Sequence, residues 1–243
     1  MALRSPRFAR TSPDQQRGSA LAACVLALVL ASPALAVGGG DDGGTTGFSN
    51  SDTSPGQKAI LEYKTGERRL ERAREMQQQI VEARAAGDEK RVAKLEKDAA
   101  GMYARAEKYF GKALEYDEDL YQAWSSLGYT LRHLDRWDEA LAAYDRAVAL
   151  EPRYAEAVEY RAEAYLELGR LEDAKAGYVQ LVTWVRPMAD RLMAKMETWV
   201  EARTAEPGDV DPAQIAALAS WIVERKEQDG AFEPFSAADR ATW

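Results

Sequence analysis

Residues 121–154, YQAWSSLGYTLRHLDRWDEALAAYDRAVALEPRY, decide the fold of this chain. The stretch carries a spaced set of large and small apolar residues that ends in a proline: Trp124, Leu127, Gly128, Leu131, Ala140, Tyr144, Ala147 and Pro152. Proline cannot continue a helix, so we expect a helix to end at Pro152. Gly and Pro are scarce between residues 57 and 206, which allows long helices and predicts an all-α protein.

The spacing of these residues resembles the tetratricopeptide repeat (TPR), with Leu131 and Tyr144 as common substitutes for the usual aromatic residues. The resemblance implies two antiparallel helices that meet at small residues, here Gly128 and Ala140. Bulk at either position would separate the helices and lower stability by about 1 to 3 kcal/mol. The larger residues of the set are expected to fill the space between the helices and toward the next unit.

Residues 155–188 resemble a second repeat in the same register. The matching positions are Val158, Ala162, Tyr165, Gly169, Ala174, Tyr178 and Leu181. The unit departs from the family pattern at Arg161, where leucine is usual, and at Arg186, because the proline is displaced to Pro187. We therefore expect irregular packing at the far end of this unit.

Two long helical patterns precede the clear repeat, in residues 57–118. Small and apolar residues recur in each pattern at spacings of three and four, and Gly87 separates the two. The distance from Gly87 to Ala106 exceeds the matching distance in the two repeats by 14 residues, which is two heptads. We interpret residues 57–118 as a TPR-like unit with elongated helices; an unrelated coiled-coil hairpin is the alternative.

A last pair of helices is predicted in residues 188–228, with one helix over 188–203 and the other over 211–228. Asp211 and Pro212 are typical of a helix N-cap and a first helical position. The pair lacks the repeat signature and fits a terminal cap, because an uncapped last repeat would expose apolar surface. Residues 229–243 are predicted to be a mobile tail.

The expected fold is therefore an all-α, short right-handed TPR-like solenoid. It has an elongated N-terminal hairpin, two repeats and a C-terminal pair of capping helices, all within residues 57–228.

The first 36 residues have the pattern of a secretory signal peptide. A leader with four arginines precedes an apolar run over residues 20–31, and Ala34-Leu35-Ala36 supplies a small-x-small cleavage site. We expect cleavage near Ala36 and a periplasmic or secreted protein without stable membrane insertion; an uncleaved signal anchor is the alternative. Residues 37–56, rich in Gly, Ser, Thr and Asp, are predicted to be a flexible linker.

Composition and charge exclude several classes of protein. The chain is 46% hydrophobic and 30% charged, as expected of a soluble protein with a core. Its formal net charge is −8, and loss of a leader with net charge +3 would make it −11, which disfavours nucleic acid and anionic membranes as partners. Cys24, the only cysteine, would leave with the leader, and its lipidation is disfavoured because most of the apolar run follows it.

In TPR proteins the first helix of each unit lines a concave groove. The resemblance assigns groove positions to Gln122, Ser125, Tyr129, Arg132 and His133 in the first repeat, and to Glu156, Glu159, Glu163, Leu166 and Glu167 in the second. The four glutamates share one helix face, where each raises the pKa of the others unless a cation pairs with it. We expect this groove to hold a basic segment of a partner protein. The alternative is a solvated helix face whose charge is relieved by Arg153, Arg161 and Arg170.

No arrangement of residues in the sequence predicts catalysis or metal binding. His133 is the only histidine, so a mature chain without cysteine holds no Ser-His-acid or Cys-His set, and the sequence has no CxxC, HExxH, EF-hand or P-loop motif. We therefore expect no enzyme activity, metal or cofactor, and predict an exported protein–protein interaction scaffold. The alternatives are an enzyme or small-ligand carrier of the cell envelope built on a helical solenoid, and a structural protein that self-assembles as a homo-oligomer through the long hairpin.

Overall fold

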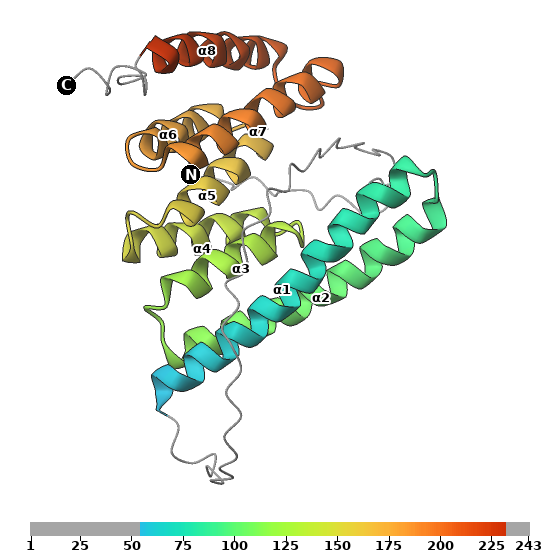
Figure 1. Ribbon diagram of the computed structural model, residues 1–243, viewed down its shortest axis with the longest axis vertical. Coiled ribbons are helices and arrows are strands. Elements are labelled where there is room, and N and C mark those ends of the chain that lie inside the picture. Colours follow the sequence, from blue (N-terminus) through green and yellow to red (C-terminus); the bar gives the residue numbers. More distant parts are fainter. Residues whose placement is uncertain (1–53, 232–243) are drawn as a thin grey trace, which may run out of the picture.

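The computed structural model describes residues 54–231, and this part of the chain is all-α, as predicted (Figure 1). It contains eight helices and no strands: α1 (Pro55–Ala85), α2 (Glu89–Tyr116), α3 (Tyr121–Arg132), α4 (Trp137–Leu150), α5 (Ala155–Glu167), α6 (Leu171–Val182), α7 (Arg186–Ala205) and α8 (Pro212–Ala231). The predicted signal peptide, most of the predicted linker and residues 232–243 lie outside the described residues.

Consecutive helices pack in pairs: α1 with α2, α3 with α4, α5 with α6, and α7 with α8. A second set of contacts joins α1, α3, α5 and α7 in succession, so the first helices of the pairs lie side by side. The α1–α2 hairpin is much longer than the other pairs, and its tip projects away from the stack formed by α3 to α8 (Figure 1).

Glycine allows the two helices of each repeat to approach closely. A Cβ added at Gly128 of α3 would lie 2.7 Å from the Tyr144 ring and 3.0 Å from the Ala140 carbonyl oxygen, both on α4. A Cβ added at Gly177 of α6 would lie 2.6 Å from the Cβ of Ala162 on α5. These distances confirm that Gly128 and Ala140 lie where the helices meet.

The α1–α2 hairpin repeats this contact near its base. A Cβ added at Gly66 of α1 would lie 2.6 Å from the Phe110 ring of α2. Gly66 and Phe110 are 44 positions apart, whereas Gly128 and Tyr144 are 16 apart, so the hairpin has 14 extra residues in each helix. The shared contact supports the interpretation of the hairpin as an elongated repeat unit.

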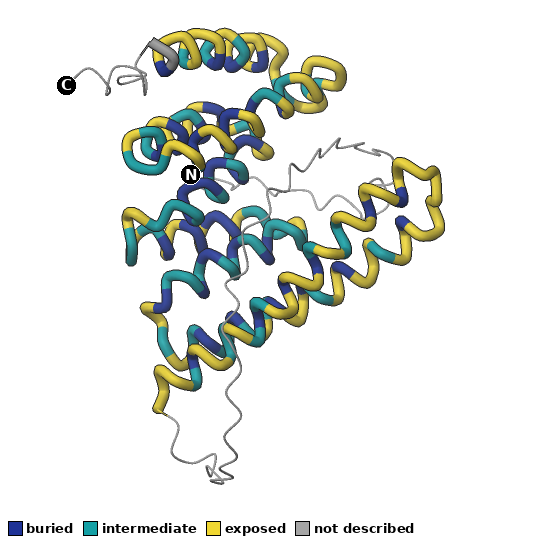
Figure 2. Tube along the Cα trace, in the orientation of Figure 1, coloured by how far each residue is buried: buried dark blue, intermediate teal, exposed yellow. Residues whose placement is uncertain are grey.

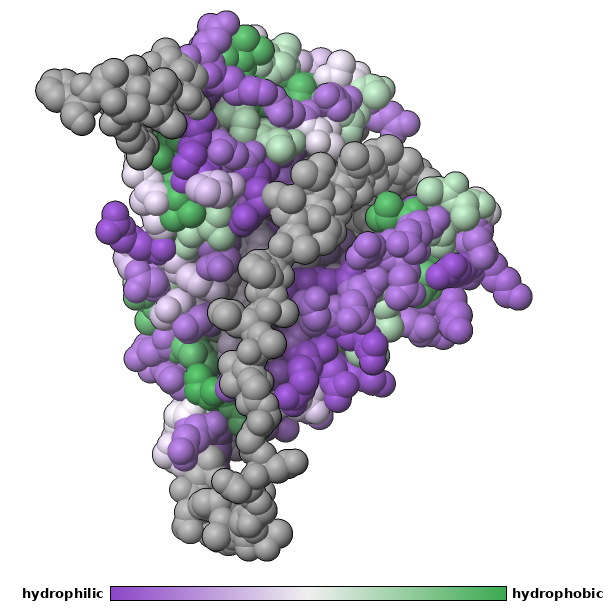
Figure 3. Space-filling view, viewed as in Figure 1, coloured by the Kyte–Doolittle hydropathy of each residue, from purple (hydrophilic) through white to green (hydrophobic). Residues whose placement is uncertain are grey.

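Beyond this contact the two long helices are joined by a seam of apolar residues, which includes Ile80, Ala83, Val92 and Ala99. Buried residues follow this seam and exposed residues surround the tip (Figure 2). The outer surface of the hairpin is mostly hydrophilic on the face seen in Figure 3. α1 begins at Pro55, two residues inside the predicted linker, because Ser54 and Gln57 form a reciprocal capping box.

Matching turns join the helices of the two repeats. Asp135 and Gly169 are 34 positions apart, and both have left-handed backbone conformations, with φ of 59° and 69°. Glycine adopts this conformation without strain, and aspartate tolerates it better than most residues. The second repeat thus keeps the backbone geometry of the first.

The last helix pair, α7 and α8, covers the core of the second repeat. One buried cluster takes residues from α5 to α8, among them Val158, Leu181, Leu192 and Leu218. This cluster removes the apolar end of the second repeat from water, as expected of a terminal cap.

Both ends of α8 are fixed by aspartates. As predicted, Asp211 precedes Pro212 and accepts a hydrogen bond from the Ala213 amide at 2.9 Å. The helix extends past residue 228 to Ala231, so residues 229–231 do not belong to the predicted tail. The reason is that buried Asp229 accepts a hydrogen bond from the Tyr178 hydroxyl of α6 and pairs with Arg225 at 3.0 Å.

Replacing Gly128 with leucine is expected to lower the melting temperature markedly, because any side chain there collides with the Tyr144 ring and the Ala140 carbonyl. Even Gly128→Ala should lower the free energy of unfolding by about 1 to 3 kcal/mol. Circular dichroism during heating and urea titration measure both effects.

The matched control is Gly101→Ala in α2, where an added Cβ meets nothing within 4 Å. This change should raise stability by about 0.5 to 1 kcal/mol, because alanine favours the helix more than glycine does. Equal effects at the two glycines would contradict the packing argument.

Candidate functional site

The two helices to which the sequence assigns the groove, α3 and α5, lie next to each other between α1 and α7. We call the surface formed by α1, α3, α5 and α7 the first-helix surface. Of the ten predicted groove residues, those that are partly exposed or exposed are Gln122, Tyr129, Arg132, His133, Glu156, Glu163 and Glu167. Ser125, Glu159 and Leu166 are 2 to 3% exposed, and Leu166 belongs to the core cluster of α5 to α8. Ser125 and Leu166 therefore serve packing and offer no surface to a partner.

Arg132 of α3 lies at the centre of the first-helix surface. Its guanidinium carbon is 5.1 Å from the centroid of the Tyr129 ring and 5.8 Å from that of the Tyr160 ring. Its Nη1 donates a hydrogen bond of 2.8 Å to Oε2 of Glu163 on α5. Arg74 of α1 also lies over the Tyr129 ring, at 4.8 Å. Cation–π contacts and a charge-assisted hydrogen bond thus join α1, α3 and α5.

Two further glutamates of α5 are paired with arginines of α7. Glu159 accepts two hydrogen bonds from Arg191, of 3.0 and 2.9 Å, and Oε2 of Glu167 lies 3.8 Å from Nη2 of Arg203. Burial raises the pKa of the Glu159 carboxyl, and the hydrogen bonds from Arg191 oppose this shift. With Glu163 held by α3, three of the four glutamates have a cationic partner on a neighbouring helix.

These cations are not the ones that the sequence suggested. Arg161 pairs with Asp145 at 2.7 Å and Arg170 pairs with Asp173 at 2.8 Å, while Arg153 lies over the Trp184 ring. The expectation that arginines within residues 153–170 neutralise the glutamates is therefore wrong. The arginines that do so come from the adjacent first helices, because α3, α5 and α7 lie side by side.

Two carboxylates of the first-helix surface, Glu67 of α1 and Glu156 of α5, have no lysine or arginine within 4.0 Å among residues 54–231. Glu67 accepts a hydrogen bond of 2.7 Å from the Ser126 hydroxyl. Burial raises the pKa of Tyr63 and of Tyr154, and the charges of both glutamates raise each further. Since these four side chains lie within electrostatic range of one another, we call Tyr63, Glu67, Tyr154 and Glu156 the acidic–tyrosine cluster.

Tyr63 and Glu67 were not among the predicted groove residues, although the sequence holds the signal that identifies them. Gly66 makes the same contact as Gly128, so the two glycines are equivalent. Tyr63 and Glu67 then occupy the positions that Ser125 and Tyr129 hold in the first repeat. Aligning the glycines thus places both residues at groove positions.

His133 is a packing residue at the junction of hairpin and repeat. Its ring stacks on Tyr103 of α2, with centroids 4.6 Å apart and planes 1° from parallel, and lies 4.6 Å from the Tyr129 ring. Burial is the main cause, together with the charges of Arg132 and Arg74, that lowers the pKa of His133 to about 3. Its Nε2 atom is buried and has no hydrogen-bond partner among residues 54–231. His133 is therefore neutral at physiological pH.

The described residues contain no group of three or more His, Cys, Asp or Glu side chains placed to hold a metal ion. None of the helices between residues 54 and 231 combines the length and apolar character that a membrane span requires.

The pKa of His133 predicts a pH dependence of stability. The unfolded state binds the proton near pH 6.5 and the folded state only near pH 3, so the free energy of unfolding should fall as the pH drops from 7 to 4. His133→Phe keeps an aromatic ring and removes the titration, so urea titrations at pH 7 and pH 4.5 should show a smaller decrease for this variant. Identical decreases in both proteins would show that His133 does not carry the effect.

Comparisons with known proteins identify the repeat. A family model described as tetratricopeptide repeat matches residues 121–154. Two solved structures, both crystal structures of MamA, show a limited similarity. One is 16% identical with a TM-score of 0.38, covering 63% of this chain and 97% of that chain; the other is 17% identical with a TM-score of 0.39, covering 75% and 99%. No curated protein matches the chain. Residues 121–154 are thus a tetratricopeptide repeat, and the chain contains this protein-interaction repeat within an all-α fold.

Proposed function

We propose that this protein is an exported interaction scaffold whose first-helix surface holds a basic segment of a partner protein. The acidic–tyrosine cluster is the observation that carries the proposal, because it lies on the surface that TPR units present to their ligands. Export is supported only by the signal-peptide pattern of residues 1–36, which lie outside the described residues.

The ion pairs of the first-helix surface concentrate its free negative charge in one place. Glu159, Glu163 and Glu167 share their charge with arginines of this chain, so a partner would have to displace those arginines. Glu67 and Glu156 carry no such pair, and their charges are available to a cation from outside. The proposed basic segment therefore binds across α1, α3 and α5.

The tyrosines of the cluster suit a lysine or arginine side chain. A cation is attracted by the face of an aromatic ring as well as by a carboxylate. Both attractions are stronger where water is partly excluded. Tyr63 and Tyr154 are partly buried, and the Tyr121 ring packs edge-on against Tyr154 with centroids 4.9 Å apart. The rings are thus held by packing before a partner arrives, which lowers the entropic cost of binding.

The direct test is the double variant Glu67→Gln with Glu156→Gln. Crosslinking and mass spectrometry of a native envelope extract would supply the partner, and its affinity for the purified protein would be measured at two salt concentrations. The double variant should bind about tenfold more weakly and show a flatter salt dependence, because two carboxylates without a close cationic partner are neutralised.

The matched control is Glu172→Gln, which removes an exposed carboxylate of α6 that pairs with Lys175 on the same helix. This variant should bind as the unchanged protein does. An unchanged affinity and salt dependence in the double variant, or a partner segment without Lys or Arg, would refute the proposed site.

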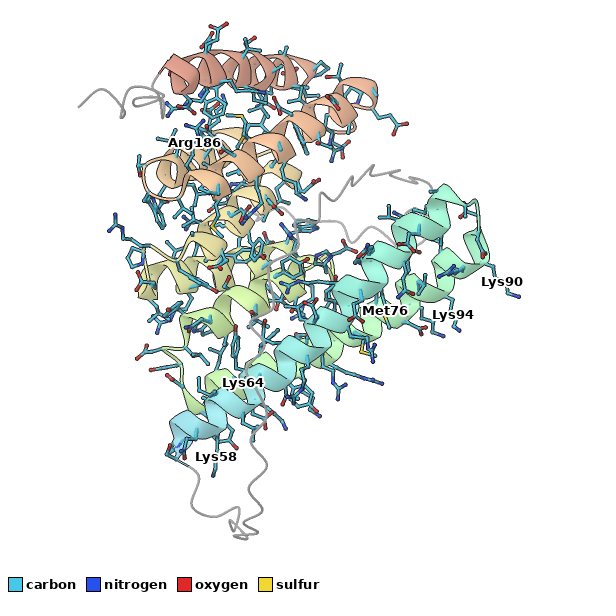
Figure 4. The ribbon with its side chains drawn as sticks, in the orientation of Figure 1. Lys58, Lys64, Met76, Lys90, Lys94 and Arg186 are labelled. Atoms are coloured by element: carbon cyan, nitrogen blue, oxygen red, sulfur yellow. The ribbon has the colours of Figure 1, made fainter. Side chains whose placement is uncertain are left out.

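A second candidate function, self-assembly through the long hairpin, is favoured by the charge distribution. Residues 55–116 hold 14 Lys and Arg against 11 Asp and Glu, whereas residues 117–231 hold 13 against 23. Lys90 and Lys94 project from the tip of the hairpin, and Lys58 and Lys64 lie near the other end of α1 (Figure 4). The net-positive hairpin of one copy is complementary to the net-negative helices of another.

Self-assembly predicts a mass that depends on salt. Size-exclusion chromatography with light scattering should show a dimer or larger species at low salt and a monomer at high salt. Lys90→Glu with Lys94→Glu should abolish the larger species, whereas Lys175→Glu with Lys226→Glu, outside the hairpin, should preserve it. A monomer at every salt concentration would exclude this candidate.

A further inference from the structure

The outer side of α2 carries a straight row of basic residues. A spacing of four, three and four residues occurs twice in succession, and the positions so defined hold lysine or arginine except at Gly101 in the centre. Eleven residues make about three turns of an α-helix, so these positions lie in one line along the helix axis for about 33 Å. We call the six cations the basic stripe: Lys90, Lys94, Lys97, Arg105, Lys108 and Lys112.

The basic stripe faces away from the rest of the described protein. It lies opposite the buried side of α2, which includes Val92, Ala99 and Ala106, and α2 packs against α1 and α3. Lys90 and Lys94 point outward from the helix in Figure 4. Five of the six side chains are exposed and the sixth is partly exposed. The stripe is therefore open to a partner along its whole length.

The charge of the stripe is largely unpaired. Within residues 54–231 only Lys112 has a carboxylate within 4.0 Å, that of Glu62 on α1. Glu96 and Glu107 of α2 pair instead with arginines outside this helix. Ion pairs thus use acidic groups of α2 to join it to its neighbours and leave five cations of the stripe to water.

Two glycines of α2 have no packing role within the described residues. A Cβ added at Gly101, within the stripe, or at Gly111, beside it, would meet nothing within 4 Å. Glycine inside a helix weakens it relative to alanine, so these residues lower stability without an intramolecular benefit. Ala93, Ala100 and Ala104 are exposed along the same flank of the stripe. The backbone of a second chain can therefore approach this side of α2 closely.

Shape and charge together favour an acidic helix as the occupant. A helix with carboxylates at the same spacing of four, three and four residues presents them in one line, with a carboxylate opposite each cation. Small residues between two helices allow their axes to approach to about 8 Å. The axial length of about 33 Å then admits several ion pairs in a row.

Other anionic partners fit this surface less well. Helices that lie on membranes also insert large apolar side chains, and Tyr116 is the one exposed large apolar side chain in residues 89–116, past the end of the stripe. The net charge of −8 opposes the approach of a long polyanion such as DNA.

We propose that α2 binds an acidic helix of a partner protein along the basic stripe, with the backbone of that helix close to Gly101 and Gly111. The inference is independent of the first-helix surface, to which α2 does not contribute. Glu67→Gln with Glu156→Gln should therefore leave binding at the stripe unchanged.

A designed peptide tests the match between spacing and stripe. The probe is a stapled, alanine-based helix as long as the stripe, with glutamates at spacings of four, three and four residues. A second peptide has the same composition with its glutamates distributed around the helix. Fluorescence anisotropy with the purified protein should give a Kd about tenfold lower for the matched peptide, and high salt should reduce this difference. Equal Kd values for the two peptides would overturn the proposal.

Variants of α2 test where the matched peptide binds. Lys97→Gln with Lys108→Gln should weaken binding about tenfold, whereas Lys58→Gln with Lys64→Gln removes the same charge from α1 and should have no effect. Gly101→Leu should also weaken binding about tenfold without lowering the melting temperature, because leucine favours the helix. Equal losses in the two lysine pairs, or unchanged binding with Gly101→Leu, would contradict the proposed site.

The same protein distinguishes other occupants of the stripe. Tighter binding to phosphatidylglycerol vesicles or to duplex DNA than to the matched peptide would overturn the proposal. Light scattering that shows a dimer of the unchanged protein and a monomer of the Lys97→Gln, Lys108→Gln variant would also overturn it and assign the stripe to a second copy.

Discussion

The close approach of paired helices at a glycine is the contact on which the rest of the structure depends. Gly66 meets the Phe110 ring, Gly128 meets the Tyr144 ring, and Gly177 meets the methyl group of Ala162. Because each pair is this compact, the first helices of successive pairs can touch one another directly. Side chains from α1, α3, α5 and α7 then meet on one surface, which no single helix could provide.

That surface is organised by charges that cross from helix to helix. Arg132, Arg191 and Arg203 each pair with a glutamate of α5, so the central helix is held electrostatically from both sides. Partly buried pairs of this kind fix geometry more than they add stability, since desolvation offsets much of the attraction. These pairs neutralise three of the four glutamates on this face of α5. The charge of Glu156, near the start of α5 and beside Tyr154, is left without a close cation.

The sequence predicted the features that depend on local spacing. Helical periodicity placed the hairpin and the last helix pair, and the residues around Gly128 identified the repeat. The ionic partners of α5 could not be found in this way, because α7 lacks the repeat signature that would have aligned Arg191 and Arg203 with it. The state of His133 was equally hidden, because the ring that stacks on it, Tyr103, comes from α2 of another helix pair.

The length of α1 fixes the distance between Glu67 and the tip of the hairpin. The helix runs unbroken for 31 residues from Pro55, with Glu67 as its thirteenth residue and the hairpin tip at Ala85. At about 1.5 Å per residue, these two points are about 27 Å apart. A partner held at Glu67 that also touches the tip must therefore extend over about eight residues. In the proposed function, the two extra heptads would therefore set the length of segment that can reach both points, a property independent of its charge.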